Sequence, residues 1–248
     1  MAVTAYLLGT HSLADSLAVA IGPIDALNSV LINAMVFAFV PMLTEQTGAA
    51  RTALYLKMSR VLGRLFLLLT LATALFAPFL IQVLAPGLDP AFYSKAVMNL
   101  RIGSLSIFGA GLAAVHTALL YTDRRFAPSA FYQACLNLFT IVCALGFWKF
   151  LGVYGFAIGY TLGAWVQLAV VWFFAHSGLR TDNLPACATG WREIVARPGS
   201  IVVYAAALAS NIIFTRAFAT NAGPGMAAAL DYCMRGVGVP LAFLVSPI

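Results

Sequence analysis

The sequence contains few charged residues. Only 9% of its 248 residues are Asp, Glu, Lys or Arg, whereas 62% are hydrophobic. Soluble proteins have about 25% charged and about 45–50% apolar residues. Because 14 basic and 8 acidic side chains cannot cover a water-facing surface of this size, the composition excludes a soluble globular protein. It predicts a chain whose surface faces lipid.

Residues that bind metals or nucleic acids are also scarce or scattered. The cysteines form no C-x-x-C pair, and no histidine stands at a metal-ligand spacing from them. The net charge of +6 is not concentrated in basic clusters interleaved with aromatic residues, as a nucleic-acid binder would require. We therefore expect no metal, no cofactor and no nucleic-acid partner.

Long apolar runs separated by breakers or charges dominate the chain. A helix crosses a bilayer in about 20 residues, and eight runs approach or exceed that length. Gly22 and Pro23 separate the first two runs, and the apolar start lacks the basic leader and cleavage site of a signal peptide. We predict an all-α polytopic membrane protein with about eight transmembrane helices, which cover approximately residues 2–21, 24–43, 61–84, 96–121, 127–148, 151–174, 200–218 and 226–248.

The basic residues are distributed unevenly between the loops. The loops after the second, fourth and sixth spans contain eight of them, at Arg51, Lys57, Arg60, Arg124, Arg125, Arg180, Arg192 and Arg197. The opposite loops contain only Lys95 and Lys149. Since cytoplasmic loops are enriched in Lys and Arg, the first set is predicted to be cytoplasmic. Neither end of the chain has a polar tail, so we also expect the sequence to be part of a longer membrane protein.

Several short motifs follow one another in the order seen in a known family. They are Ala14-Asp15, Ala38-Phe39-Val40-Pro41, Ala85-Pro86-Gly87 with Asp89, Leu100-Arg101-Ile102, Arg125-Phe126-x-Pro128-x-Ala130, Asn137, Gly159 with Gly163, Gln167-Leu168, and Tyr232 with Arg235 and Pro240. In this order the chain resembles the MurJ/MviN lipid II flippases.

The resemblance implies a MATE-like fold of the multidrug/oligosaccharidyl-lipid/polysaccharide exporter type, with two helical lobes around a central cavity. Residues 1–176 would form the first lobe, with six spans of which the first is shortened. Residues 177–199 would form a cytoplasmic connector, and residues 200–248 the first two spans of the second lobe. The implied function is the movement of lipid II, or a related polyprenyl-diphosphate oligosaccharide, across the bacterial inner membrane by alternating access.

The chain departs from the family at several cavity positions. The family usually has basic residues where this chain has Gly22, Asn28 and Ser29, and a Glu where it has Asn33. The Ala-Asp-Arg of the eighth span reads Cys233-Met234-Arg235. The cationic centre that would hold a diphosphate is therefore partly neutralised.

Ionisable residues at membrane depth cost at least about 2.5–3.5 kcal/mol each, so they indicate cavities or partners. Arg235, near the middle of the eighth span, either binds the lipid diphosphate or pairs with Asp231 one turn earlier. Asp15 either couples transport to a cation or a proton, or orients an arginine of the cavity, or is simply hydrated near the end of its span. Arg101 and Arg216, near outer span ends, are expected to reach the interface.

Uncharged residues complete the predicted site. Asn28 and Asn33 are candidates to line a hydrated cavity with Arg235 and Asp15, although such amides also join helices by hydrogen bonds. Gly155, Gly159 and Gly163 fall on one helix face, where small residues allow a neighbouring helix to approach closely.

Three other functions are compatible with a membrane protein of this composition to different degrees. A membrane enzyme acting on polyprenyl phosphates would need clustered carboxylates, but those of this chain are scattered, at Asp15, Asp25, Glu45, Asp89, Asp123, Asp182, Glu193 and Asp231. A non-transporting relative that acts as a membrane interaction protein agrees with the lost arginines. A drug or metabolite exporter on the same scaffold differs from a flippase only in its ligand.

Overall fold

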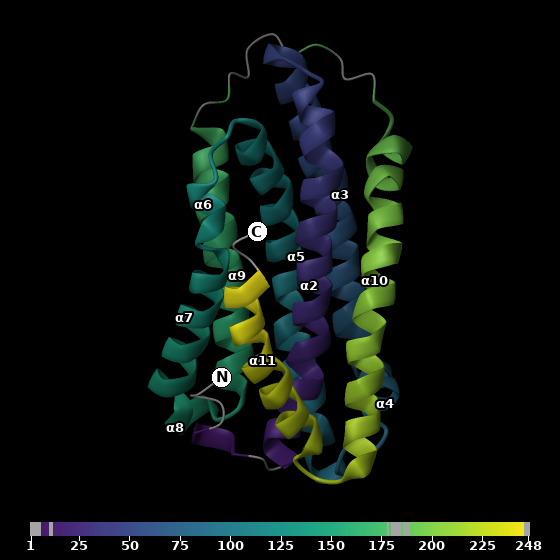
Figure 1. The fold of residues 1–248 in the computed structure, drawn as a ribbon, viewed down its shortest axis with the longest axis vertical. Coiled ribbons are helices and arrows are strands. Elements are labelled where there is room, and N and C mark those ends of the chain that lie inside the picture. Colours follow the sequence, from purple (N-terminus) through teal and green to yellow (C-terminus); the bar gives the residue numbers. More distant parts are fainter. Residues whose placement is uncertain (1–5, 10–11, 178, 180–184, 186–188, 246–248) are drawn as a thin grey trace.

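The computed structural model describes residues 6–9, 12–177, 179, 185 and 189–245, which form helices, turns and loops and contain no β-strand. The helices pack into an elongated bundle (Figure 1). They are α2 (Ser12–Thr44), α3 (Gly48–Leu75), α4 (Ala77–Leu84), α5 (Pro90–Thr122), α6 (Ala127–Ala130), α7 (Tyr132–Gly146), α8 (Trp148–Leu151), α9 (Tyr154–His176), α10 (Trp191–Ala222) and α11 (Met226–Val245). The predicted all-helical fold is confirmed.

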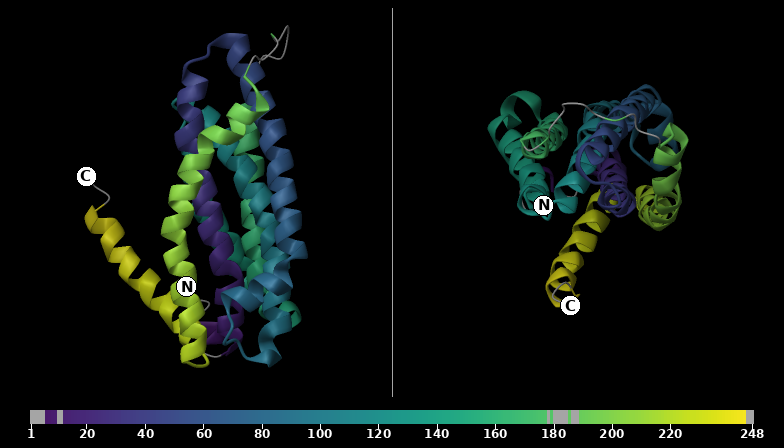
Figure 2. Two further views of the ribbon diagram at one scale, coloured as in Figure 1. Left: turned by 90° about the vertical axis from the view of Figure 1, so that its right-hand side faces the viewer. Right: turned by 90° about the horizontal axis from the view of Figure 1, so that it is seen from above.

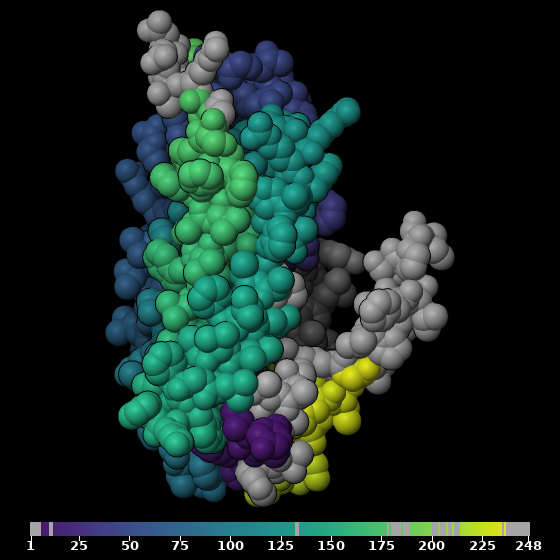
Figure 3. All heavy atoms as spheres, turned by 90° about the vertical axis from the view of Figure 1, so that its left-hand side faces the viewer, coloured from purple at the N-terminus to yellow at the C-terminus, as the bar shows by residue number. Residues whose placement is uncertain are grey.

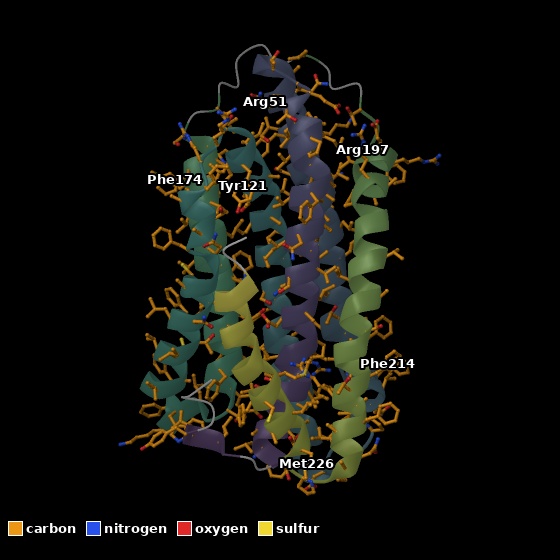
Figure 4. All side chains as sticks on the ribbon, in the orientation of Figure 1. Arg51, Tyr121, Phe174, Arg197, Phe214 and Met226 are labelled. Atoms are coloured by element: carbon orange, nitrogen blue, oxygen red, sulfur yellow. The ribbon has the colours of Figure 1, made fainter. Side chains whose placement is uncertain are left out.

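Five helical segments within the described residues are long and apolar enough to cross a membrane. They are α2, α3, α5, the segment Ala127–Gly146 and α9, so the predicted number of about eight spans is not confirmed. Large apolar side chains remain exposed on the outside of the bundle, as at Phe174 and Phe214 (Figure 4). Such a surface is typical of a helical membrane protein.

The first two predicted spans form one helix. α2 is continuous over 33 residues with Pro23 in its interior, so the expected break at Gly22-Pro23 is wrong. At about 1.5 Å per residue this helix is long enough to cross the bilayer once. Proline is tolerated inside membrane helices because neighbouring groups satisfy the backbone carbonyl that it leaves free.

The end of the predicted connector is also helical. α10 begins at Trp191 and continues through Pro198. Arg197 and Glu193 form an i,i+4 ion pair in its first turns, at 3.0 Å, and such pairs stabilise a helix. The polar stretch before residue 200 therefore extends the seventh predicted span.

The core lies where α2 and α5 pack together. Leu43, Leu100 and Ile107 are completely or almost completely buried there. Gly111 of α5 faces the ring of Phe66 in α3, and a Cβ atom at this position would lie 2.7 Å from the ring. Small residues on α5 therefore allow the other helices of the bundle to approach it closely.

The C-terminal ends of α2, α5 and α9 lie at one end of the bundle (Figure 1). We call this the basic end, because Arg51 and Arg197 lie there (Figure 4). Arg51, in the first turn of α3, forms an ion pair with Asp123, which follows α5, at 3.0 Å. Met226, where α11 begins, lies at the opposite end (Figure 4).

The helix α11 leaves the bundle at an angle. Figure 2 shows that α11 diverges from α2 and α10 as it extends from the opposite end. Its first turns meet the bundle next to the N-terminal residues (Figure 3). The contacts between α11 and the rest of the molecule therefore begin at the opposite end.

Candidate functional site

The polar residues of interest meet where α2, α10 and α11 come together near the opposite end. We call this region the junction and define it by Asp15, Gly22, Arg216, Gly225 and Asp231. It joins the helices before residue 177 to α10 and α11.

An ion pair connects α10 and α11 at the junction. Nη2 of Arg216 donates to Oδ1 of Asp231, and the two residues are only 7% and 6% exposed. The expectation that Arg216 reaches the membrane interface is therefore wrong. A buried guanidinium is tolerated because the carboxylate compensates part of its lost hydration.

The guanidinium of Arg216 lies against Gly22 of α2. A Cβ atom at position 22 would collide with Nη1 and Cζ of Arg216 and would lie 2.9 Å from Nη2. The absence of a side chain at Gly22 therefore makes room for the arginine.

Asp15 joins α2 to the N-terminus of α11. Its Oδ1 accepts a hydrogen bond from the backbone N–H of Ala228 at 2.7 Å, and its Oδ2 accepts one from the backbone N–H of Gly225. The carboxylate is 3% exposed. An anion at a helix N-terminus satisfies free amide groups and interacts favourably with the helix dipole. Asp15 therefore fixes the position of α11 relative to α2.

Asn28 lies outside the junction, where α2 packs against α5 and α9. Its Nδ2 donates to Ser106 Oγ at 3.0 Å and to Tyr160 Oη at 3.2 Å. Tyr160 in turn donates to Oδ1 of Asp25 at 3.0 Å. The amide is completely buried, so in this conformation it connects α2, α5 and α9.

Asn33 lines a groove of about 640 Å³ between α2, α5, α6 and α9. The polar lining includes Thr117, Ser129 and Gln167. Tyr121, which also lines the groove, lies towards the basic end (Figure 4). The two candidate asparagines therefore lie in different places, one in the core and one on the groove wall.

Arg235 belongs to α11, but its side chain lies outside the described residues. Its pairing with Asp231 and its contact with a diphosphate therefore stay predictions. Arg235 follows Ala228 by seven residues, which is about two helical turns. The tether at Asp15 consequently sets the position of the helix that carries Arg235.

The three glycines of α9 face α7. A Cβ atom at Gly159 would lie 2.5 Å from the carbonyl oxygen of Phe139, and one at Gly163 would lie 2.8 Å from Cα of Leu136. At Gly155 the distance to the carbonyl oxygen of Cys143 would be 3.0 Å. The helices approach so closely that backbone atoms occupy the space of the missing side chains.

The described residues contain no group of three or more His, Cys, Asp or Glu side chains that would hold a metal ion. The acidic residues of the site are engaged in other ways: Asp15 accepts from backbone amides and Asp231 pairs with Arg216. The chemistry available at the junction is therefore electrostatic.

Sequence reasoning missed the role of Arg216. The insertion cost that drew attention to Arg235 applies equally to a second arginine near a span end. A glycine in place of the family's basic residue was a further signal. The structure connects the two, because the arginine of α10 fills the space beside Gly22.

Comparisons with known proteins agree with this architecture. The family model described as lipid II flippase MurJ matches residues 4–248. A solved structure described as "Lipid II flippase MurJ, inward closed conformation" superimposes with a TM-score of 0.80 at 19% sequence identity. The match covers 95% of this chain and 50% of that one, so the chain spans about half of the solved protein. The curated proteins give no match.

Proposed function

The chain belongs to the MurJ lipid II flippase family, and from that premise we propose that the protein moves lipid II, or a related polyprenyl-diphosphate oligosaccharide, across the bacterial cytoplasmic membrane. The family consists of transporters rather than enzymes. The observation that carries the proposal is the family match over residues 4–248. The chain would supply the first lobe and the beginning of the second.

The positions of the contacts between α2 and α11 support alternating access. Asp15 binds the N-terminal amides of α11 near the opposite end, and from there α11 diverges from the bundle (Figure 2). The groove lined by Asn33 lies towards the basic end. Contact between α2 and α11 at one end, with divergence of α11 from the bundle towards the other, agrees with one state of an alternating-access transporter.

The proposed transport requires cations that face an anionic headgroup. We assign this role to Arg235, because a guanidinium is permanently charged and binds phosphate through two parallel N–H groups. Asp15 acts as a positioning residue, since it holds the helix that contains Arg235. Asn33 would contact the polar headgroup along the groove, and Asn28 would maintain the packing behind it.

Growth of a bacterial strain depleted of its own lipid II flippase tests this function. The complete gene should restore growth, Arg235→Lys should restore it partly, and Arg235→Ala should fail to restore it. Asp231→Asn is the control for a purely structural role of Arg235: it breaks the pair with Arg216 and any pair with Arg235. Equal loss of protein from the membrane in Asp231→Asn and Arg235→Ala would indicate that Arg235 acts structurally. Full rescue by Arg235→Ala at normal protein levels would refute the assignment.

A further inference from the structure

We propose that Arg216 is a second diphosphate-binding cation, which α10 supplies to the place beside α2 where the side chain of residue 22 would otherwise lie. The inference rests on the proposed function and names a residue that contacts the substrate. Its ligand is the diphosphate group of a polyprenyl-linked lipid. Arg216 would engage this group when α10 and α11 move away from α2.

The first argument is steric. The guanidinium of Arg216 occupies the volume that a side chain at Gly22 would need, because a Cβ atom there would collide with Nη1 and Cζ. A basic side chain at position 22 and the arginine at position 216 therefore exclude one another. The space beside Gly22 therefore still contains a cation, which α10 supplies through Arg216 in place of a basic side chain on α2.

The second argument concerns hydrogen-bond donors. A guanidinium has five N–H groups, and Nη2 of Arg216 binds Asp231. Nε and Nη1 are buried and have no hydrogen-bond partner among the described residues. Unpaired buried donors on a charged group are unfavourable. Three N–H bonds on two neighbouring nitrogens match a diphosphate, which presents several acceptor oxygens.

The third argument is the location of Arg216 between α2, which belongs to the first predicted lobe, and α10 and α11, which belong to the second. Gly22 lies on α2, whereas Arg216 and Asp231 lie on α10 and α11. Movement of one lobe against the other would open the edge of the guanidinium that now faces Gly22. Asp231 then remains as the partner of Nη2 and keeps the arginine oriented.

Direct binding tests the inference in the protein expressed from its complete gene and purified in detergent. Farnesyl diphosphate, a short polyprenyl diphosphate, is titrated by calorimetry, and inorganic pyrophosphate is titrated in parallel. Arg216→Ala should weaken the binding of farnesyl diphosphate by about tenfold or more. Stronger binding of farnesyl diphosphate than of pyrophosphate would support a lipid ligand, and equal Arg216-dependent binding would support a site that reads the diphosphate alone.

A charge relocation makes the test specific. The double variant Gly22→Arg with Arg216→Ala returns the cation to α2 and should regain most of the lost affinity, whereas Gly22→Arg alone should destabilise the protein because two side chains compete for one space. Arg197→Ala is the matched control, since it removes an exposed arginine of the same helix, and it should bind normally. Failure of the double variant to exceed Arg216→Ala in affinity would contradict the proposal.

Two further variants separate ligand binding from a structural clamp. Arg216→Lys keeps the pair with Asp231 but loses the planar fork, so it should bind farnesyl diphosphate several-fold more weakly without loss of melting temperature. Asp231→Asn keeps an oxygen that accepts from Nη2 and orients the arginine, but it removes the competing negative charge, so this variant should bind at least as tightly as wild type. Unchanged affinity in Arg216→Lys, or equal loss of affinity in Asp231→Asn and Arg216→Ala, would overturn the inference.

The inference and the proposed function fail in different ways. Arg216-dependent binding without rescue of a flippase-depleted strain would refute the proposed function and leave the binding site standing. Rescue by wild type and equally by Arg216→Ala would refute the role of Arg216 and leave the function standing.

Discussion

At the residue scale, the buried carboxylates of this protein act by holding helices in place. Asp15 binds two backbone amides of α11, and Asp231 binds the guanidinium of Arg216. Each anion is almost fully buried and meets hydrogen-bond donors there. This explains how acidic side chains are retained in a molecule with so few charges.

Replacing Asp15 with alanine should weaken the attachment of α11. Two charge-assisted hydrogen bonds to buried amides are lost, and each is worth about 1.5–3 kcal/mol. We expect a fall of several degrees in the melting temperature of the purified protein in detergent. Asp89→Ala is the matched control, because Asp89 accepts an exposed hydrogen bond from Ala91 at the start of α5. A smaller effect at Asp15 than at Asp89 would show that the tether is unimportant.

The sequence predicted which residues of the site are unusual better than it predicted their partners. Asp15 was singled out because of the cost of ionisable groups in lipid, and Asp231 because it lies one turn before Arg235. Their partners are Gly225, Ala228 and Arg216, and Asp15 lies 210 residues from Gly225 in the chain. Such pairs depend on how α11 docks against α2 and α10, which local patterns do not encode.

At the scale of the elements, proline and glycine interrupt a helix less readily in lipid than in water. Long apolar runs correctly indicated α5 and α9, because both are bounded by charges or turn residues. The same reasoning divided α2 at Pro23, where the helix continues. Neighbouring helices stabilise a membrane helix around a proline, and the sequence of α2 alone does not reveal those neighbours.

The glycines of α9 provide a test of helix packing. Gly159→Ala should separate α7 from α9, because the new Cβ atom would lie 2.5 Å from a backbone oxygen that cannot move independently. Overpacking of this kind costs about 1–3 kcal/mol, which thermal melting in detergent would detect. Gly146→Ala in α7 is the control, since nothing lies within 4 Å of its Cβ position. Equal melting temperatures for the two variants would contradict the close packing.

At the scale of the whole molecule, the distribution of basic residues and the arrangement of the helices indicate the same orientation in the membrane. Arg51 and Arg197 lie at the same end of the bundle (Figure 4), as predicted from the number of spans between their segments and from the excess of basic residues in them. Merging the first two predicted spans removes one crossing before these segments. The merger leaves their common side unchanged, because the later helices still alternate in direction.

Reporter fusions should place this end in the cytoplasm. Fusions after Arg51, Arg125 and Arg192 are all expected to be active as cytoplasmic reporters and inactive as periplasmic ones. A fusion after Lys95, in the first turns of α5, is the internal control and should give the reverse result. Periplasmic activity from two of the first three fusions would overturn the orientation.

The central claim is that the protein moves a polyprenyl-diphosphate lipid through a cavity lined by arginine. The most direct measurement follows fluorescent lipid II in vesicles that contain the protein expressed from its complete gene, with a quencher that cannot cross the membrane. The account predicts that wild-type protein makes inner-leaflet lipid II accessible to the quencher, and that Arg235→Ala and Arg216→Ala greatly slow this. Quenching no faster than in protein-free vesicles, or equally fast in both variants and wild type, would contradict it.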